Sequence, residues 1–258
     1  MTDVPLAAPP GRTLLWLLDV DAALRDPDDP RFRVPPHRRA LLALLSHQPD
    51  TLVAIVGGRG VADLAEAVGV GEPVIYIGYH GLEIRGQGLD SVHPDARASR
   101  GLLARIARSL AAVTDALPGV RLERHPLALT LHVGRASEAD ADRAEEALYR
   151  VVESHLSDHR VRCVRRADAF ELLPVVGAGE LDVYHRLAAE LEQRQGRPVW
   201  TICIADDVRG AGWFEAVSDA GVSVAVGPRP SRASCSVQAP ADVDDLLRQA
   251  VADACGSL

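Results

Sequence analysis

Apolar runs alternate with amphipathic stretches along this chain, and that alternation limits its fold more than any other feature. The runs at 13–18 ("TLLWLL"), 51–58 ("TLVAIVGG") and 73–81 ("PVIYIGYHG") have the length and composition of buried strands. Between them, residues 36–48 and 60–70 repeat their apolar side chains with the period of a helix. Strands separated by single helices predict an α/β protein with a parallel sheet.

The pattern changes between about residues 82 and 174. Residues 82–92 alternate around Gly-Gln-Gly, which is typical of a β-hairpin. The elements predicted after it are helices at 95–117 and 137–156, two strands within 120–134 broken at Pro126, and two strands within 160–174. The first pattern then resumes with a helix at 179–196, strands at 198–207, 222–227 and 235–239, and helices near 211–219 and at 242–254. We therefore expect an α+β insertion inside an α/β domain.

Charge excludes one broad class of function. The chain has 258 residues and a net charge of −8, and no cluster of cationic residues stands out. Proteins that bind nucleic acids depend on concentrated positive charge, so we expect no nucleic-acid partner. All 28 fixed cations are arginines, because the sequence contains no lysine. No site in this protein can therefore use a lysine ammonium group.

The remaining bulk features predict a cytoplasmic protein without a membrane partner. Cys163, Cys203, Cys235 and Cys255 lie far apart and form no C-x-x-C motif, which favours reduced thiols. The start of the chain lacks the basic and apolar regions of a signal peptide. No apolar run approaches the roughly 18 residues that a membrane span needs.

Two predicted strands end in paired carboxylates. Asp19 and Asp21 follow the first strand, and Asp206 and Asp207 follow the strand at 198–207. Ligands of open α/β sheets gather beyond the carboxyl ends of the strands, where four such carboxylates would repel one another unless a cation lies among them. Oxygen ligands suit Mg²⁺. The alternative for either pair is that the aspartates cap helices or form turns.

Six motifs in the same order resemble those of the haloacid dehalogenase superfamily, and specifically its trehalose-6-phosphate phosphatase branch. The matching segments are "LLDVDAAL" (D-x-D-G-T-L), "VAIVGGR" (V-A-I-V-S-G-R), "YIGYHGLEI" (G-x-H-G-L-E-I), "LPGVRLERHPLALTLHV" (the Glu-x-Lys and His of the cap), "FELLP" (E-x-R-P) and "CIADDVRGAGWFEAV" (G-D-D-x-T-D-E-D-A-F). The resemblance implies a Rossmann-like core with a parallel sheet, formed by residues 1–83 and 171–258. It also implies an inserted α+β cap of the C2 type at residues 84–170.

The resemblance further implies a reaction and its residues. Asp19 would be the nucleophile and form an aspartyl-phosphate, and Asp21 would be the general acid and base. Magnesium would be held by the Asp19 carboxylate, the Asp21 carbonyl and Asp206, with Asp207 close by. The residues implied to contact a sugar phosphate are Arg59, His80 and Glu171 in the cleft, and Glu123, His125 and His132 in the cap.

Several positions depart from the family pattern. The Gly-Thr after the second aspartate is Ala22-Ala23, and the serine of S-G-R is Gly57. The lysine that holds the nucleophile and the phosphate together falls near Gly179. In the cap, the lysine is His125, and the arginine of E-x-R-P is Leu173. The missing groups all bind or neutralise phosphate or sugar, and losing one preorganised donor costs on the order of 10²–10³ in rate.

An arginine is the only fixed cation that can replace the lysine. Arg209, two positions beyond Asp207, is one candidate, with a surface role as the alternative. Arg165 and Arg166 are further candidates, for which a surface role is the favoured interpretation. For Glu123, His132 and Glu171, a surface or packing role stands beside ligand contact.

Two functional hypotheses follow. The first is a Mg²⁺-dependent phosphatase acting on the phosphate of a disaccharide or related sugar. The second is a pseudophosphatase that binds a sugar or a partner enzyme and lacks turnover. Phosphoryl transfer to another acceptor is a third, more distant possibility.

Overall fold

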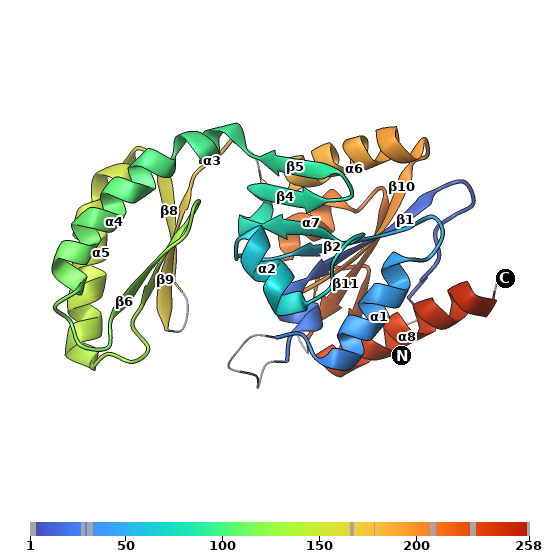
Figure 1. Cartoon of the computed structure of the whole chain (residues 1–258), viewed down its shortest axis with the longest axis horizontal. Coiled ribbons are helices and arrows are strands. Elements are labelled where there is room, and N and C mark those ends of the chain that lie inside the picture. Colours follow the sequence, from blue (N-terminus) through green and yellow to red (C-terminus); the bar gives the residue numbers. More distant parts are fainter. Residues whose placement is uncertain are drawn as a thin grey trace. The chain divides into compact units, whose positions relative to one another are not determined.

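The computed structural model describes residues 4–26, 29, 33–165, 168–177, 179–206, 210–227 and 231–256 (Figure 1). The chain divides into two compact units, Met1–Ser91 with Ala178–Leu258, and Val92–Gly177. These boundaries differ from the predicted insertion at 84–170 at both ends. The hairpin at 83–92 extends the sheet of the first unit, and the strand that contains Glu171 belongs to the second.

The first unit is built on an eight-stranded sheet with the order β12-β11-β10-β1-β2-β3-β4-β5. Its strands are β1 (Thr13–Asp19), β2 (Thr51–Val56), β3 (Ile75–Gly78), β4 (Glu83–Gly86), β5 (Leu89–Val92), β10 (Val199–Ala205), β11 (Gly221–Val226) and β12 (Cys235–Val237). Pairing is parallel from β12 to β3 and antiparallel between β3 and β4. The predicted α/β class with a parallel sheet is confirmed.

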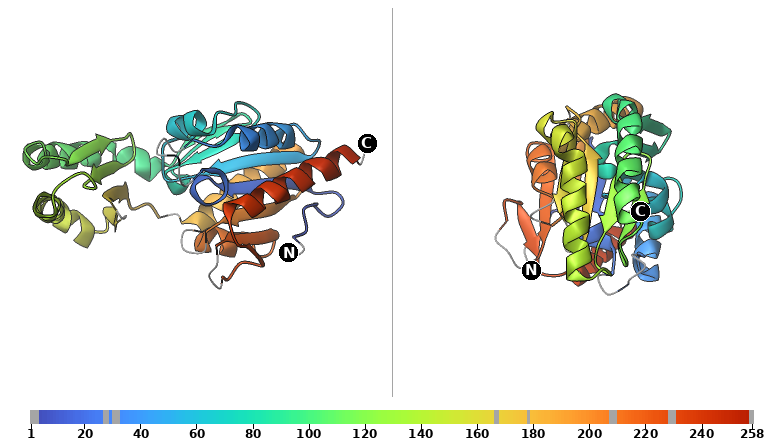
Figure 2. Two further views of the ribbon diagram at one scale, coloured as in Figure 1. Left: turned by 90° about the horizontal axis from the view of Figure 1, so that it is seen from below. Right: turned by 90° about the vertical axis from the view of Figure 1, so that its left-hand side faces the viewer.

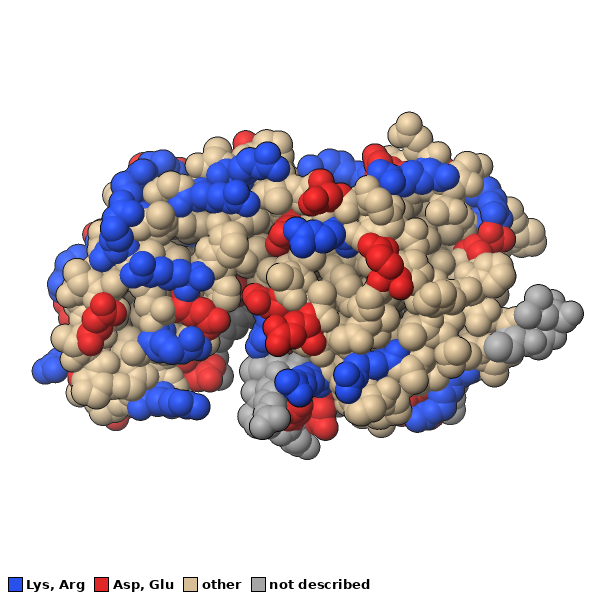
Figure 3. Space-filling view, in the orientation of Figure 1, with Lys and Arg blue, Asp and Glu red and all other residues tan. Residues whose placement is uncertain are grey.

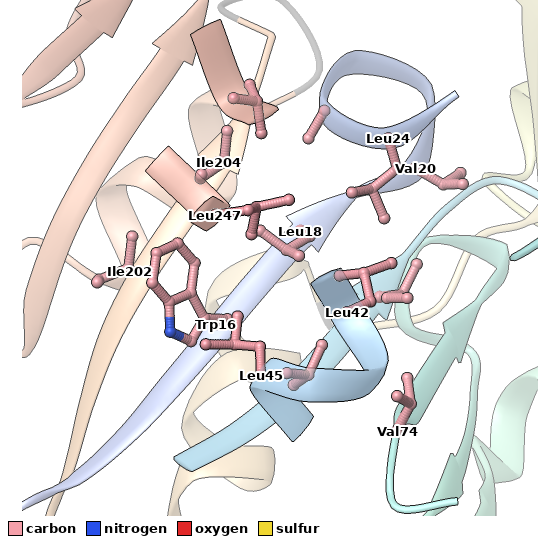
Figure 4. Packing of buried hydrophobic residues seen from close by; sticks show 14 of the residues in the cluster. Trp16, Leu18, Val20, Leu24, Leu42, Leu45, Val74, Ile202, Ile204 and Leu247 are labelled. Carbon is pink, nitrogen blue, oxygen red and sulfur yellow. The ribbon is translucent and has the colours of Figure 1, made fainter. Parts of the chain in front are cut away.

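Helices cover both faces of this sheet, which explains why β1 is apolar from Leu14 to Leu18. Trp16 and Leu18 pack against α1 (Pro36–Ser46), α2 (Val61–Val68) and α8 (Pro240–Gly256). Figure 4 shows these two side chains of β1 among Leu42, Leu45 and Leu247. Leu15 and Leu17 point to the other face, against α6 (Glu180–Gln195) and α7 (Ala211–Ala216).

The order of the strands places a topological switch at β1. From β1 the chain continues to β2 and β3 on one side, and it later returns through β10 on the other side of β1. Leu18 lies opposite Ile204 in the parallel register. The loops after β1 and β10 therefore leave the same edge of the sheet in different directions, which is where ligands of doubly wound folds bind.

The second unit contains a four-stranded antiparallel sheet with the order β6-β7-β9-β8. Its elements are α3 (Pro94–Ala98), α4 (Arg100–Thr114), β6 (Arg121–Arg124), β7 (Leu129–His132), α5 (Glu138–Ser157), β8 (Val161–Arg165) and β9 (Ala169–Pro174). The helix predicted at 95–117 is divided at Ser99 into α3 and α4. Figure 2 shows α4 and α5 side by side in this unit. Leu129 and Leu131 of β7 pack with residues of these two helices, so the alternating residues Thr130 and His132 occupy the opposite face of the strand.

The surface of the first unit is mixed in charge. On the face shown in Figure 3, arginines and carboxylates are interspersed with uncharged groups. Within the described parts of the chain, no helix combines the length and the apolar character that crossing a membrane would require.

A buried ion pair ties the two outer helices α1 and α8 to the segment that follows β1. Arg38 of α1 is 6% exposed, and its Nε donates to Asp244 Oδ1 of α8 at 2.5 Å. Its Nη1 donates to the carbonyls of Leu24 and Arg25, at 2.9 and 3.1 Å. Burial alone would raise the pKa of Asp244, but the hydrogen bonds and charges of Arg38 and His37 outweigh it and hold that pKa below its ordinary value.

Replacing Asp244 with alanine should destabilise the first unit strongly, because it leaves the buried Arg38 guanidinium without its carboxylate. We expect a loss of about 3–5 kcal/mol in the free energy of unfolding at pH 7, measured by urea denaturation. A group with a lowered pKa stabilises the fold above its unfolded pKa of about 3.9 and loses that effect as the pH falls through the lower folded value. The difference in the free energy of unfolding between the wild-type protein and Asp244→Ala should therefore become smaller below about pH 4.

The neighbouring Asp245 provides the matched control. Its side chain is 61% exposed and pairs with Arg248 on the surface of α8. Asp245→Ala should change the free energy of unfolding by no more than about 1 kcal/mol. Equal effects of the two substitutions would contradict the role assigned to the Arg38–Asp244 pair.

Candidate active site

Asp19 is a buried carboxylate at the end of the central strand. It is 5% exposed, and its Oδ1 accepts the N–H of Ala22 at 2.8 Å. This contact caps a single π-helical turn, η1 (Val20–Leu24), which follows β1 directly. Asp19 therefore caps this turn, and its role in metal binding and catalysis stays a prediction. The contact also fixes the orientation of a carboxylate whose burial would be costly without hydrogen bonds.

The side chains of Leu17 and Cys203, which lie next to Asp19 on the same face of the sheet, are uncharged. Side chains alternate along β1, so Asp19 shares its face with Leu17, which is paired in register with Cys203 of β10. Burial, and secondarily the charge of Asp19, raise the pKa of the Cys203 thiol. The thiol therefore stays protonated at neutral pH and adds no charge beside the carboxylate. The described cysteines at 163, 203 and 235 are all free.

Asp206 follows β10 immediately and is half-buried. Its carbonyl accepts the N–H of Gly210 at 2.8 Å, which fixes the backbone at this point. Since β1 and β10 are neighbouring parallel strands, Asp19 and Asp206 leave the sheet at the same edge, on the two sides of the topological switch. Asp207 and Arg209 lie outside the described residues.

The groups predicted to bind Mg²⁺ suit that ion chemically. They are two carboxylates and the Asp21 carbonyl, and Mg²⁺ is usually held by one or two carboxylates together with waters and substrate phosphate oxygens. In the parts of the chain that the structure describes, no three His, Cys, Asp or Glu side chains form a ready-made metal cage.

Asp21 is paired with an arginine that the sequence analysis did not single out. It lies within η1, and its Oδ1 is 3.3 Å from Nε of Arg25, four residues further on. The side chains are 32% and 24% exposed, so both are partly shielded from water. Arg25 lies one residue beyond the "LLDVDAAL" motif, so the motif does not point to it. The i, i+4 spacing of opposite charges was the available signal.

Arg59 and His80 lie on two loops that are joined at the same edge of the sheet. Residues 57–59 follow β2, and the short 3₁₀ turn η2 (Tyr79–Gly81) follows β3. The backbone N–H groups of Tyr79 and His80 donate to the carbonyls of Arg59 and Gly57, at 2.9 and 3.0 Å. Tyr79 and His80 both adopt left-handed φ angles, 50° and 56°, which non-glycine residues seldom do. Such strain is concentrated at functional sites.

Glu83 is a second residue that the sequence analysis passed over, although it lies in the "YIGYHGLEI" motif. Its Oε2 accepts the N–H of Val61, the first residue of α2, at 3.1 Å. A carboxylate at a helix N-terminus is favourable because it meets the unpaired amides there. Glu83 thereby ties β4 to the helix that begins directly after the Arg59 loop.

In the second unit, Glu123 is the centre of a charged cluster. Its Oε2 lies 2.7 Å from Nε2 of His132 and accepts from Nη2 of Arg121 at 2.9 Å. Its Oε1 lies 3.5 Å from Nε2 of His125. Burial raises the pKa of Glu123, but hydrogen bonding to His132 and the charges of His125 and Arg121 give a net lowering. Glu171 is opposite Thr130, which in turn is opposite Glu123.

Comparisons with known proteins identify the family of this chain. A sequence profile of the trehalose-phosphatase family matches residues 17–245. The chain belongs to the trehalose-phosphatase family. It is 25% identical over 269 residues to trehalose-phosphate phosphatase B of Arabidopsis thaliana, covering 97% of this chain and 70% of the relative. It is 26% identical over 236 residues to the trehalose-phosphate phosphatase of Mycobacterium marinum (strain ATCC BAA-535 / M), covering 88% of this chain and 59% of that protein.

A comparison with solved structures finds the same fold. The crystal structure of a trehalose-6-phosphate phosphatase related protein superimposes with a TM-score of 0.77 at 19% identity, covering 95% of this chain and 100% of that one. At 19% sequence identity, this similarity is evidence for the fold alone. The chain spans only 59% of the mycobacterial relative.

Two of the positions where this member departs from the family pattern, Ala23 and Gly57, have structural explanations. Ala23 is fully buried in the apolar cluster around β1, so a hydroxyl there would lie among hydrocarbon groups. A Cβ atom added to Gly57 would come within 2.8 Å of Leu64 and 2.9 Å of Val20. Gly179, by contrast, is exposed at the start of α6, has a φ angle of −89°, and has open space around it.

The arginines considered as replacements for the family lysine are only partly described. Arg165, on β8 of the second unit, is 68% exposed and donates to Glu145 at 2.8 Å. Its guanidinium also lies 5.3 Å from the centre of the Phe170 ring. These contacts agree with the surface role favoured for Arg165. Arg166 and Arg209 fall outside the described residues.

The Glu123 cluster predicts a pH-dependent contribution to stability. Because its pKa is lowered, Glu123 stabilises the fold above its unfolded pKa of about 4.3, and the effect is lost as the pH falls through the folded value. Glu123→Gln should lower the melting temperature at pH 6 and lower it by less at pH 3, as measured by circular dichroism. Glu146→Gln, which removes an exposed partner of Arg150 on α5, is the control and should alter neither value. An effect of Glu123→Gln that is as large at pH 3 as at pH 6 would contradict the assignment.

Proposed function

We propose that this protein is a Mg²⁺-dependent phosphatase that removes the phosphoryl group from a disaccharide-type sugar phosphate through an aspartyl-phosphate on Asp19. The observation that carries the proposal is the buried, amide-oriented Asp19 carboxylate at the topological switch, with Asp206 at the end of the adjacent strand. Membership of the trehalose-phosphatase family supports the same reaction class.

Asp19 and Asp21 divide the chemistry between them. An oxygen of Asp19 attacks phosphorus, and the bond from phosphorus to the sugar oxygen breaks while Asp21 donates a proton to that oxygen. Asp21 then takes a proton from water, whose oxygen attacks the aspartyl-phosphate, and inorganic phosphate and the free Asp19 carboxylate result. The Ala22 N–H keeps the nucleophile oriented throughout. When bound, Mg²⁺ offsets negative charge on the carboxylates and phosphoryl oxygens.

The second unit is proposed to act as the cap that selects the sugar. Glu123, His125, His132 and Glu171 supply hydrogen-bonding groups of the kind that bind sugar hydroxyls. His125 stands where the family pattern has a lysine. We therefore propose a sugar phosphate as the substrate class and do not narrow it to trehalose 6-phosphate.

Asp19→Asn should abolish turnover, because an amide is a far poorer nucleophile than a carboxylate. The measurement is phosphate release from a panel of sugar phosphates with Mg²⁺, and the expected loss in kcat is at least about 10³-fold. Asp219→Asn changes an exposed aspartate beyond α7 and should retain the full rate. Turnover that survives in Asp19→Asn would rule out Asp19 as the nucleophile. A wild-type protein that binds sugar phosphates without releasing phosphate would instead support the pseudophosphatase hypothesis.

Gly179→Lys should restore a phosphate-binding cation. The position is exposed, its backbone angles suit any residue, and no atom blocks an added Cβ. An additional cation close to the phosphoryl group should raise kcat/KM by roughly tenfold or more. Gly177→Lys, also exposed and with open space around it, is the matched control for charge alone. An equal rate increase in both variants would show that general charge, rather than the family lysine position, is responsible.

A further inference from the structure

The proposed reaction, on which this inference rests, leaves a deficit of positive charge in the site. A phosphoryl group carries about −1.5 to −2 charges at neutral pH and must approach a second anion, Asp19. The lysine of the family pattern is absent from this chain, and its position falls near Gly179, the residue that caps the start of α6. Its replacement must be an arginine or a protonated histidine, since the chain has no lysine.

Arg25 lies on the same short turn as the two proposed catalytic aspartates. Asp19 begins η1 as its cap, Asp21 lies in its first part, and the N–H of Arg25 closes the turn on the carbonyl of Val20 at 2.9 Å. The Arg25 Nε is 3.3 Å from the Asp21 carboxylate. Among the described residues, this ion pair brings a guanidinium directly to a proposed catalytic carboxylate.

The backbone of Arg25 is held from the other side by the buried Arg38. The carbonyls of Leu24 and Arg25 both accept from Nη1 of Arg38, which Asp244 and the Pro240 carbonyl anchor in turn. The end of η1 is therefore fixed to α1 and α8, far more firmly than a surface loop would be. Because the backbone that carries this cation is fixed, less conformational entropy is lost when the cation binds an anion.

We propose that Arg25 binds the phosphoryl oxygens of the substrate and supplies the positive charge that the family pattern places on a lysine. A guanidinium is suited to this task because it stays charged and presents a planar fork of N–H donors that matches two oxygens of a phosphate. Its partial burial strengthens the interaction, since charges attract more strongly where water is partly excluded. Arg25 also keeps the Asp21 carboxylate beside the bound phosphate.

The first test measures turnover. Arg25→Ala should lower kcat/KM for sugar phosphates by roughly 10²-fold, and Arg25→Lys should recover part of the loss. Guanidinium ion added in solution should restore activity to Arg25→Ala and leave Asp19→Asn inactive. Arg248→Ala, which removes a surface arginine of α8 that pairs with Asp245, is the control and should keep the wild-type rate. An Arg25→Ala variant within about threefold of an active wild-type enzyme would overturn the assignment.

The second test does not depend on turnover, so failure of the proposed function and failure of this inference can be told apart. Orthovanadate, a phosphate analogue, should raise the melting temperature of the wild-type protein and of Arg248→Ala, and it should have little effect on Arg25→Ala. Arg25→Gln, which keeps the bulk and polarity of the side chain, checks for loss of folding and should also fail to respond. A vanadate response that is equal in wild type and both Arg25 variants, or absent from the wild type, overturns the role of Arg25.

Discussion

The rest of this structure depends on the burial of one carboxylate at the end of its central strand. Asp19 is only 5% exposed, and the N–H of Ala22 satisfies one of its oxygens. That hydrogen bond requires the chain to turn sharply after β1, and η1 is the result. Asp21 and Arg25 are carried on this turn, and Asp206 leaves the neighbouring strand at the same edge of the sheet.

Polar contacts that are buried or partly buried support the site from neighbouring elements. Arg38 binds the end of η1 and is held by Asp244, while Glu83 caps the helix that follows the Arg59 loop. These contacts link α1, α8, β4 and α2 to one edge of the sheet. The arrangement explains how short loops can keep charged side chains in place, since each loop is fixed at both its backbone and a neighbouring helix.

The residues that stand where the family pattern has phosphate-binding groups differ in how they are packed. Ala23 and Gly57 are packed against apolar side chains, so the groups lost there have been replaced by hydrocarbon contacts. Gly179 faces open space, and its loss of a cation has no such structural cause. A chain without lysine must place its positive charges through arginine, whose longer and planar side chain favours different positions.

The sequence by itself determined the α/β class, the order of the strands and helices, and the strand ends that carry Asp19 and Asp206. The period and the apolar composition of a segment can be read from neighbouring residues, so β1 and β10 could be recognised from their apolar runs alone. Only the tertiary structure decided that β10 pairs with β1, that the hairpin at 83–92 extends the core sheet, and that Arg38 reaches the carbonyls at the end of η1. These contacts join residues far apart in the chain, and no local pattern encodes which distant groups will meet once both faces of the sheet are covered.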